Sequence, residues 1–150
     1  MEFICKPFYE LTLDQLYEIM VIRQTIFVLE QNCPFVDADG RDQASWHLMG
    51  YWQQELVAYA RILPVGVAYP DYASIGRVVS SSSVRSQGFG KLLVQKAIEE
   101  TYRLCGVQDI KIGAQQYLEH FYQRFGFEST PHHYLEDGIP HLSMIKKVTL

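Results

Sequence analysis

The segment from Arg85 to Lys91 most constrains how this chain can fold, because its sequence Arg-Ser-Gln-Gly-Phe-Gly-Lys places two glycines between two different patterns. Before it, residues 74–80 are short and rich in β-branched side chains, which is typical of a strand. After it, apolar side chains recur at helical spacing as far as Cys105, and a glycine follows where a helix cap is expected. The segment is therefore predicted to join a strand to the start of a helix.

A loop of this kind can hold a phosphate group. The first turn of a helix has backbone N–H groups without partners, and the helix dipole adds about half a positive charge there. Gly88 and Gly90 lack Cβ atoms, so a phosphate can approach the backbone, while Arg85 and Lys91 add positive charge. We therefore expect pyrophosphate to bind at this loop.

The spacing of the glycines excludes two other phosphate-binding motifs. A P-loop needs glycine at position 85 and Ser or Thr at position 92, where this chain has Arg85 and Leu92. A dinucleotide fingerprint needs a third glycine at position 93, where this chain has Leu93. We therefore expect neither a nucleoside triphosphate nor NAD at the loop.

Two motifs resemble those of a known superfamily. The pattern formed by Arg85, Gly88 and Gly90 resembles the acetyl-CoA signature of the GNAT acyltransferases. Tyr122 lies four residues before a Gly-Phe pair, as a tyrosine does in that superfamily. Further segments are similar to its small ElaA-like branch, so the resemblance covers most of the chain: Phe27–Pro34, Asp37, Asp39-Gly40, Gly76–Val78 and Glu136–His141.

The resemblance implies a fold and a co-substrate. The fold would be the GNAT acyl-CoA N-acyltransferase fold, an α/β (α+β) arrangement in which a mixed, bent β-sheet is flanked by helices. Residues 1–150 would form a single GNAT N-acetyltransferase domain that uses acetyl-CoA and no metal. The implied cofactor-binding residues come from the strand end and the loop: Val78, Val79, Arg85, Ser86, Gln87, Gly88, Phe89, Gly90 and Lys91.

Local patterns predict the other elements. A capping box at residues 12–15 starts a helix that runs toward Glu30. Arg23 interrupts its apolar face, and either an edge position or an internal salt bridge would accommodate this side chain. Gly76 indicates a bulge or a close backbone approach within its strand. In the first half of the chain we also expect a strand at 3–7, a loop at 31–44 and a hairpin formed by 47–52 and 56–63. In the second half we expect a strand at 108–114, parallel to the strand at 74–80, and a helix at 118–125. The final strands are expected from 127 and at 141–148, joined by an Asp-Gly turn.

The chemistry implied by the resemblance is transfer of an acetyl group from acetyl-CoA to an amine. Tyr122 is the implied general acid, because a phenol with a pKa of about 10 stays protonated at neutral pH and can donate to a thiolate of about 8.5. Backbone N–H groups at Val78 or Val79 would stabilise the oxyanion. A rival interpretation of Tyr122 is a packing residue on a short helix.

Four side chains are candidates for the general base or for the acceptor site: Glu30, His47, Glu136 and His141. Each also has a structural interpretation, as a rim salt bridge, a hairpin residue or a core histidine. A chain of water molecules is the alternative base. Among the aromatic residues, Tyr51, Trp52 and Tyr59 belong either to the core or to an acceptor groove.

The net charge and the cysteine content limit the kinds of partner and bound group that we expect. The formal net charge of −4 disfavours nucleic acid and anionic membranes and favours a cationic acceptor, either a small-molecule or a protein amine. Three cysteines without a C-x-x-C pair indicate free thiols, and the histidines form no set with metal-ligand spacing. The first residues lack signal-peptide character, and no apolar run reaches the length of a membrane span, so we expect a cytoplasmic protein.

Two alternatives to the enzyme remain at this stage. The same loop would serve a non-catalytic acyl-CoA-binding sensor, and the fold would also suit an interaction module. A homodimer is compatible with the sequence, and the identity of the amine is left open.

Overall fold

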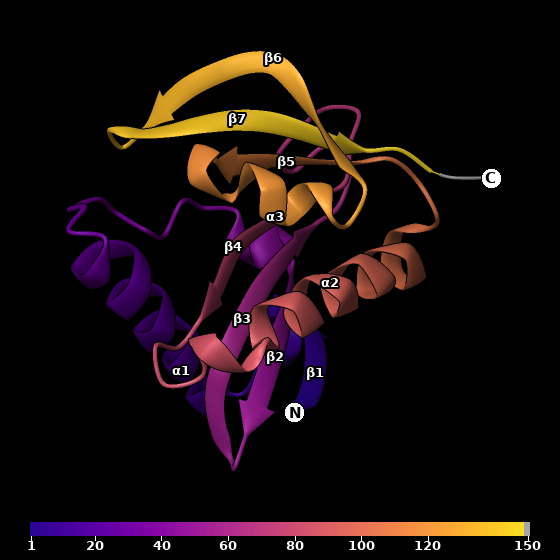
Figure 1. Ribbon diagram of the computed structural model, residues 1–150. Coiled ribbons are helices and arrows are strands. Elements are labelled where there is room, and N and C mark those ends of the chain that lie inside the picture. The colour runs from indigo at the N-terminus through magenta and orange to yellow at the C-terminus, as the bar shows by residue number, and fades with distance from the viewer. Residues whose placement is uncertain (149–150) are drawn as a thin grey trace.

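The computed structural model describes residues 1–148, so the last two residues of the expected domain lie outside the described ones. These residues form seven strands and three α-helices (Figure 1). The strands are β1 (Glu2–Pro7), β2 (Trp46–Trp52), β3 (Glu55–Leu63), β4 (Ser74–Ser80), β5 (Ile110–Gln115), β6 (Phe127–Glu136) and β7 (Ile139–Lys146). The α-helices are α1 (Leu13–Arg23), α2 (Phe89–Cys105) and α3 (Glu119–Gln123), and the short helical segments are η1 (Phe8–Glu10), η2 (Gln24–Glu30), η3 (Asp42–Ala44), η4 (Arg85–Gln87) and η5 (Gln116–Leu118).

The strands form two sheets, with the orders β1-β2-β3-β4 and β5-β7-β6. All neighbouring strands within each sheet are antiparallel. The sheets meet at one parallel bridge between Ala73 and Ile110, where the Lys111 N–H donates to the Ala73 carbonyl at 3.0 Å. The expected parallel relation of 74–80 and 108–114 is thus limited to this end. Among residues 1–148 no further pairing joins β4 to β5, and the two strands diverge.

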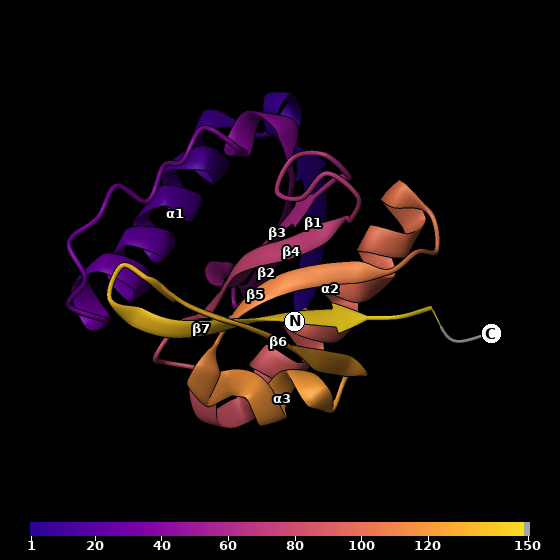
Figure 2. The ribbon, with the colours of Figure 1, turned by 90° about the horizontal axis from the view of Figure 1, so that it is seen from above.

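Helices α1 and α2 cover opposite faces of the β1–β4 sheet (Figure 2). Successive side chains of a strand point to opposite faces, and the two core clusters follow this alternation. Leu48 and Ala58 pack in the cluster with Leu93 of α2, whereas Met49 and Tyr59 pack in the cluster with Ile19 of α1. Tyr59 is fully buried, so it belongs to the core and not to an acceptor groove.

The first helix begins as predicted and then changes its hydrogen bonding. Thr12 Oγ1 accepts from the Gln15 N–H and Gln15 Oε1 accepts from the Thr12 N–H, both at 3.0 Å, which confirms the capping box. Beyond Arg23 the segment η2 is a π-helix, and the Gln31 N–H donates to the Ile26 carbonyl five residues back at 3.2 Å. Such wide turns are rare and frequently lie at functional sites.

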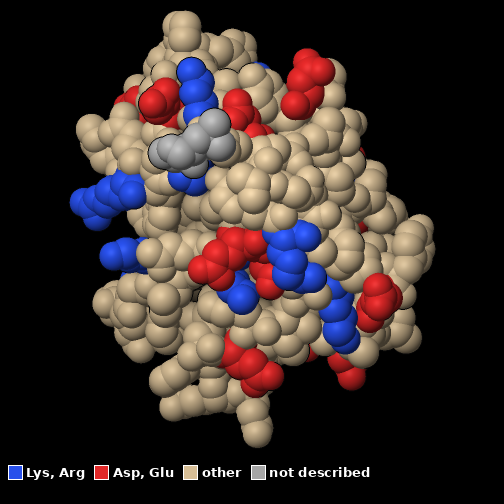
Figure 3. Space-filling view, turned by 90° about the vertical axis from the view of Figure 1, so that its right-hand side faces the viewer, with Lys and Arg blue, Asp and Glu red and all other residues tan. Residues whose placement is uncertain are grey.

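The buried Glu100 of α2 pairs with two basic side chains. Lys96 lies 3.6 Å from Glu100, and Arg103 lies 2.6 Å from the same carboxylate. Figure 3, which views the side of the molecule where α2 ends, shows acidic and basic side chains intermixed. Among residues 1–148, no helix has both the length and the apolar character of a bilayer span.

Candidate active site

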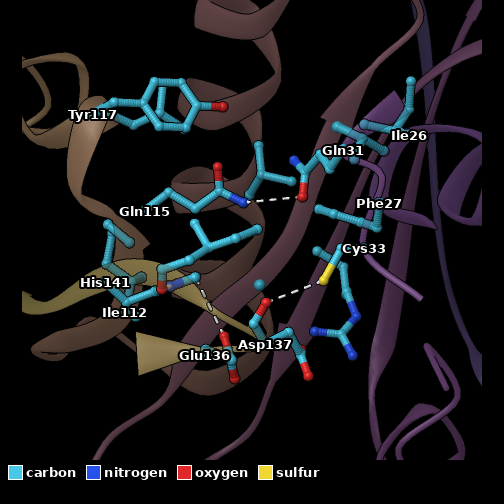
Figure 4. Close-up of a pocket in the computed structure, with 18 of the residues that line it drawn as sticks. Ile26, Phe27, Gln31, Cys33, Ile112, Gln115, Tyr117, Glu136, Asp137 and His141 are labelled. Carbon is cyan, nitrogen blue, oxygen red and sulfur yellow. Dashed lines mark hydrogen bonds and ion pairs between the residues drawn. The ribbon is translucent and has the colours of Figure 1, made fainter. Parts of the chain in front are cut away.

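A cavity of about 490 Å³ opens where β4 and β5 diverge (Figure 4). Its two long walls come from residues 75–80 of β4 and residues 112–115 of β5. One end is closed by Tyr117, Leu118 and Tyr122, beside the start of α3. The other end is formed by η2, the loop that follows it, and the tip of the β6–β7 hairpin: Ile26, Phe27, Glu30, Gln31, Cys33, Phe35, Glu136, Asp137, Ile139 and His141. We call this second end the acceptor compartment, because we propose that the acceptor binds there.

A bulge in β4 turns its backbone toward the cavity. Arg61 of β3 pairs with Gly76 while Tyr59 pairs with Val79, so Arg77 and Val78 together face one residue of β3. Arg77 has a φ of +49°, an unusual conformation for a residue other than glycine. The predicted bulge is therefore confirmed, although Arg77 rather than Gly76 has the left-handed backbone. A bulge leaves ladder groups unpaired, and the residues that follow it line the cavity.

The side chain of Arg77 is held from several directions. Its Nε lies 2.9 Å from Asp37 Oδ1 as an ion pair without hydrogen-bond geometry, and its Nη2 donates to the Asp37 carbonyl at 2.9 Å. The guanidinium also lies 5.8 Å from the ring centres of Phe27 and Phe35. Together these contacts offset the cost of the left-handed backbone, which is about 1–2 kcal/mol, and they tie the bulge to the acceptor compartment.

A buried charge network continues behind Arg77. Arg23 is fully buried and lies 2.7 Å from both Asp37 and Asp42, which settles its assignment in favour of an internal salt bridge. Arg61 lies 2.8 Å from Asp39 and 2.9 Å from Asp42. Since three arginines and three aspartates take part, their formal charges cancel. The network fixes residues 37–42, which have little regular structure, against β3 and β4.

The network lowers the pKa values of two of its carboxyl groups. Burial alone would raise the pKa of Asp42, but the hydrogen bonds and charges of Arg23 and Arg61 outweigh it and lower this pKa. Burial likewise opposes ionisation of Asp39, and hydrogen bonding to Arg61 holds the pKa of Asp39 well below its usual range. Both aspartates are therefore charged in the folded protein at neutral pH.

His47 lies in this network and does not line the cavity. Its Nε2 donates to the Asp42 carbonyl at 2.9 Å, and its Nδ1 accepts from the Tyr59 hydroxyl at 2.7 Å. The ring is fully buried, and burial lowers the pKa of His47, so the imidazole is neutral. Among the four candidates for base or acceptor contact, His47 is thus separated from the other three.

Tyr122 lies in the cavity wall, on α3. Its side chain is 8% exposed and packs edge-on against Phe121 and Phe127, with ring centres 5.2 and 5.9 Å away. Burial raises the pKa of Tyr122, and Tyr117 adds to the effect. The phenol therefore keeps its proton at neutral pH, as a proton donor must.

Glu30 and Arg85, which both line the cavity, are in direct contact. Arg85 Nη1 lies 2.7 Å from Glu30 Oε1, and Arg85 Nε donates to the Ser80 carbonyl at 3.2 Å. Glu30 ends η2 and Arg85 begins η4, so the pair joins the acceptor compartment to the glycine loop.

Glu136 and His141 form a second pair at the hairpin. His141 Nε2 lies 3.3 Å from Glu136 Oε2, and its Nδ1 donates to the Ile139 carbonyl at 2.7 Å. Asp137 and Gly138 have φ values of +50° and +79°, as a two-residue type I′ turn requires, which confirms the predicted Asp-Gly turn.

Two hydrogen bonds close the acceptor compartment (Figure 4). The Cys33 thiol donates to the Asp137 carbonyl at 3.3 Å, and Gln115 Nε2 donates to Gln31 Oε1, also at 3.3 Å. The loop after η2 is thereby fastened to β5 on one side and to the hairpin on the other. The sequence alone assigns no role to these residues, because only the fold brings them to one cavity.

The glycine loop has room for a bulky anion. Gly88 has a φ of +76° and lies directly before α2, and a Cβ atom built there would meet nothing within 4 Å. A Cβ atom at Gly90 would have the Phe121 ring, 4.0 Å away, as its nearest neighbour. Phe89 between them is buried against Val57 and Val84 and anchors the loop. Of residues 85–91, Arg85 lines the described cavity, and the six predicted residues from Ser86 to Lys91 lie outside its lining.

The diverging strands, the cavity between them and the glycine loop define an acyl-CoA N-acyltransferase fold. The crystal structure of an acyl-CoA N-acyltransferase from Pseudomonas aeruginosa matches with a TM-score of 0.90 and 38% identity, over 97% of this chain and 99% of that chain. The crystal structure of Escherichia coli ElaA matches with the same values of 0.90, 38%, 97% and 99%.

The sequence comparisons give the family. The acetyltransferase (GNAT) domain model matches residues 38–148, and the chain belongs to this family. Protein ElaA of Escherichia coli is 40% identical over 141 residues, which cover 93% of this chain and 92% of that protein. A UPF0039 protein of Synechocystis sp. is 40% identical over 142 residues, with coverages of 94% and 92%. Family and fold support acyl transfer that depends on acyl-CoA.

Proposed function

We propose that this protein transfers the acetyl group of acetyl-CoA to a primary amine by direct attack within a ternary complex. The observation that carries the proposal is the position of Tyr122, a buried phenol in the wall of a cavity that also reaches Arg85 of the glycine loop. A proton donor and a pyrophosphate-binding loop are two of the parts that such a transfer needs. The open space above Gly88 and Gly90 suits the pyrophosphate.

Different groups of the protein would carry out the successive steps of the transfer. The acceptor compartment holds the amine, whose nitrogen attacks the thioester carbonyl. Backbone N–H groups at Val78 or Val79, beside the bulge, stabilise the oxyanion that forms. Tyr122 then donates its proton to the departing thiolate as the C–S bond breaks. Because Tyr122 is buried, its hydrogen bond to the thiolate would be stronger than in bulk solvent.

The candidates for the base differ in their access to the cavity. Glu30, Glu136 and His141 line it: Glu30 forms an ion pair with Arg85, and the Glu136 carboxylate lies 3.3 Å from the His141 imidazole. His47 lies behind β3 with both ring nitrogens occupied, so we assign it a structural role. The amine proton would leave through one of the first three groups or through water.

An acetyl-CoA turnover assay tests the proposal. Purified protein is incubated with acetyl-CoA and a panel of primary amines, and released CoA is measured with a thiol reagent. Amine-dependent CoA release supports an N-acetyltransferase. Tight binding of acetyl-CoA without release for any amine would favour a sensor, and release with longer acyl-CoA substrates only would refute acetyl as the transferred group.

A further inference from the structure

The ion pair of Glu30 and Arg85 joins two segments that the proposed reaction uses separately. Arg85 opens the glycine loop, and Glu30 belongs to the acceptor compartment, yet their side chains meet at 2.7 Å. The two side chains are 44% and 33% exposed, so the pair lies at the mouth of the cavity and is open to solvent. A pair in such a position can separate at little cost, because exposed ion pairs are weak.

Arg85 has a better partner than a carboxylate once pyrophosphate enters the loop. Its Nε is held by the Ser80 carbonyl, which keeps the guanidinium near the end of β4. Phosphate oxygens carry more charge than one carboxylate and accept two parallel hydrogen bonds from a guanidinium. Arg85 would therefore turn toward the pyrophosphate and leave Glu30.

Glu30 would then be a free carboxylate in the acceptor compartment. Among residues 1–148, Arg85 is the only basic residue whose side chain lies within 4 Å of the Glu30 carboxylate. The other arginine that lines the cavity, Arg77, is held by Asp37 and cannot replace Arg85 without breaking the buried network. A cation supplied from outside is the remaining partner for the Glu30 carboxylate.

We propose, on the basis of the function proposed above, that Glu30 exchanges Arg85 for a cationic group of the acceptor. Glu30 is then a positioning residue that couples the two substrates. Acyl-CoA binds first and releases the carboxylate, and the acceptor, an amine that bears a positive charge, binds second. An acceptor with a carboxylate at this position would be repelled by Glu30 and by Glu136 at the facing hairpin.

The first test is a calorimetric titration of CoA into wild type, Glu30→Gln and Glu136→Gln. Since Glu30→Gln removes the competitor for Arg85, it should bind CoA about two- to fivefold more tightly than wild type. Glu136→Gln is the matched control, because it removes a carboxylate of the same cavity that pairs with His141, and its affinity should change by less than about twofold. In an Arg85→Gln background, Glu30→Gln should have no effect.

The outcomes separate this exchange from the function it rests on. Unchanged or weaker CoA binding by Glu30→Gln, or an equal gain in the Arg85→Gln background, would overturn the exchange while leaving the acyl-CoA site intact. Failure of wild type itself to bind CoA would overturn the proposed function.

The second test measures how CoA changes the binding of an acceptor, with 1,4-diaminobutane as the probe. Wild type saturated with CoA should bind this diamine at least about fivefold more tightly than free wild type, because Glu30 has then lost Arg85. Glu30→Gln should bind it equally with and without CoA. Equal affinity of wild type in the two states, or no binding in either, contradicts the acceptor part of the proposal.

Discussion

Arg77 and Asp37 form an ion pair, with Nε 2.9 Å from Oδ1, that connects the bulge of β4 to the loop behind the acceptor compartment. Asp37 also holds the fully buried Arg23 at 2.7 Å. One carboxylate therefore supports both the bulged backbone that we propose to face the thioester and the wall that we propose to face the amine. The geometry of the proposed site depends on the buried network rather than on the glycine loop alone.

Asp37→Asn should destabilise the fold strongly. It removes the negative charge between two arginines, one of them fully buried, and unpaired buried charges cost about 3–5 kcal/mol. We expect the free energy of unfolding, measured by urea denaturation, to fall by about 3 kcal/mol. The exposed Asp71→Asn is the control and should change it by less than about 0.5 kcal/mol. Equal effects of the two substitutions would show that the network contributes little.

Stability should fall in mild acid because of His47. Burial lowers the pKa of His47 in the folded protein, whereas the unfolded chain binds a proton at this residue below about pH 6.5. Unfolding then takes up a proton, so the free energy of unfolding should drop by up to about 1.4 kcal/mol per pH unit below pH 6.5. His47→Asn, which can still donate and accept, should lack this slope between pH 6.5 and 5 in urea denaturation. Parallel pH profiles would contradict a neutral buried His47.

The aspartates of the network act at lower pH. Arg61 and Arg23 hold the pKa values of Asp39 and Asp42 below the value of about 3.9 expected in the unfolded chain. Their contribution to stability is present above about pH 4 and is lost as the pH falls further, since the unfolded chain then binds protons at these carboxyl groups while the folded protein keeps them charged. Circular dichroism during acid titration should show cooperative unfolding below pH 4. A native spectrum and unchanged urea midpoint at pH 2.5 would refute this role.

Tyr122→Phe tests the general acid. The substitution removes the hydroxyl and keeps the ring packing, so folding should be retained while turnover of acetyl-CoA falls by about 10²-fold. Binding of acetyl-CoA should change little, because the loss concerns a group used in the transition state. Full turnover by the variant would leave Tyr122 as a packing residue.

Gly88→Ala tests the conformation of the loop. Gly88 has a φ of +76°, where an alanine is strained by about 1 kcal/mol, although the space for its Cβ is open. Gly66→Ala, at a φ of +91° in the loop between β3 and β4, also has open space and should cost similar stability. Only Gly88→Ala should weaken acetyl-CoA binding in a calorimetric titration. Equal affinities of the two variants would place the pyrophosphate elsewhere.

The parts of the fold that could be predicted carry local signals. The capping box at Thr12, the glycine at position 88 and the Asp137-Gly138 turn each depend on a few neighbouring residues, and the structure contains all three. Element ends were less accurate. The expected helix at 118–125 is a turn of η5 followed by α3, and the last strand, expected at 141–148, runs from Ile139 to Lys146.

The buried network could not be predicted from local patterns. Arg23 is 14 residues from Asp37 and 19 from Asp42 along the chain, so their contacts depend on the tertiary fold. The sequence signals of the network are an arginine in the apolar face of a helix and three aspartates within residues 37–42. The expected mixed sheet also differs in detail, because two antiparallel sheets meet at one parallel bridge. Beyond this bridge β4 and β5 diverge, and the cavity lies between them.

The most direct test of the central claim is a calorimetric titration of wild type and Gly90→Glu with acetyl-CoA. A Cβ at position 90 meets nothing closer than 4.0 Å, so the variant should fold, while its carboxylate should block and repel the pyrophosphate. We predict wild-type binding with a Kd in the micromolar range, about −8 kcal/mol, and loss of binding in the variant. Absence of binding by folded wild type would contradict an acyl-CoA site at this loop.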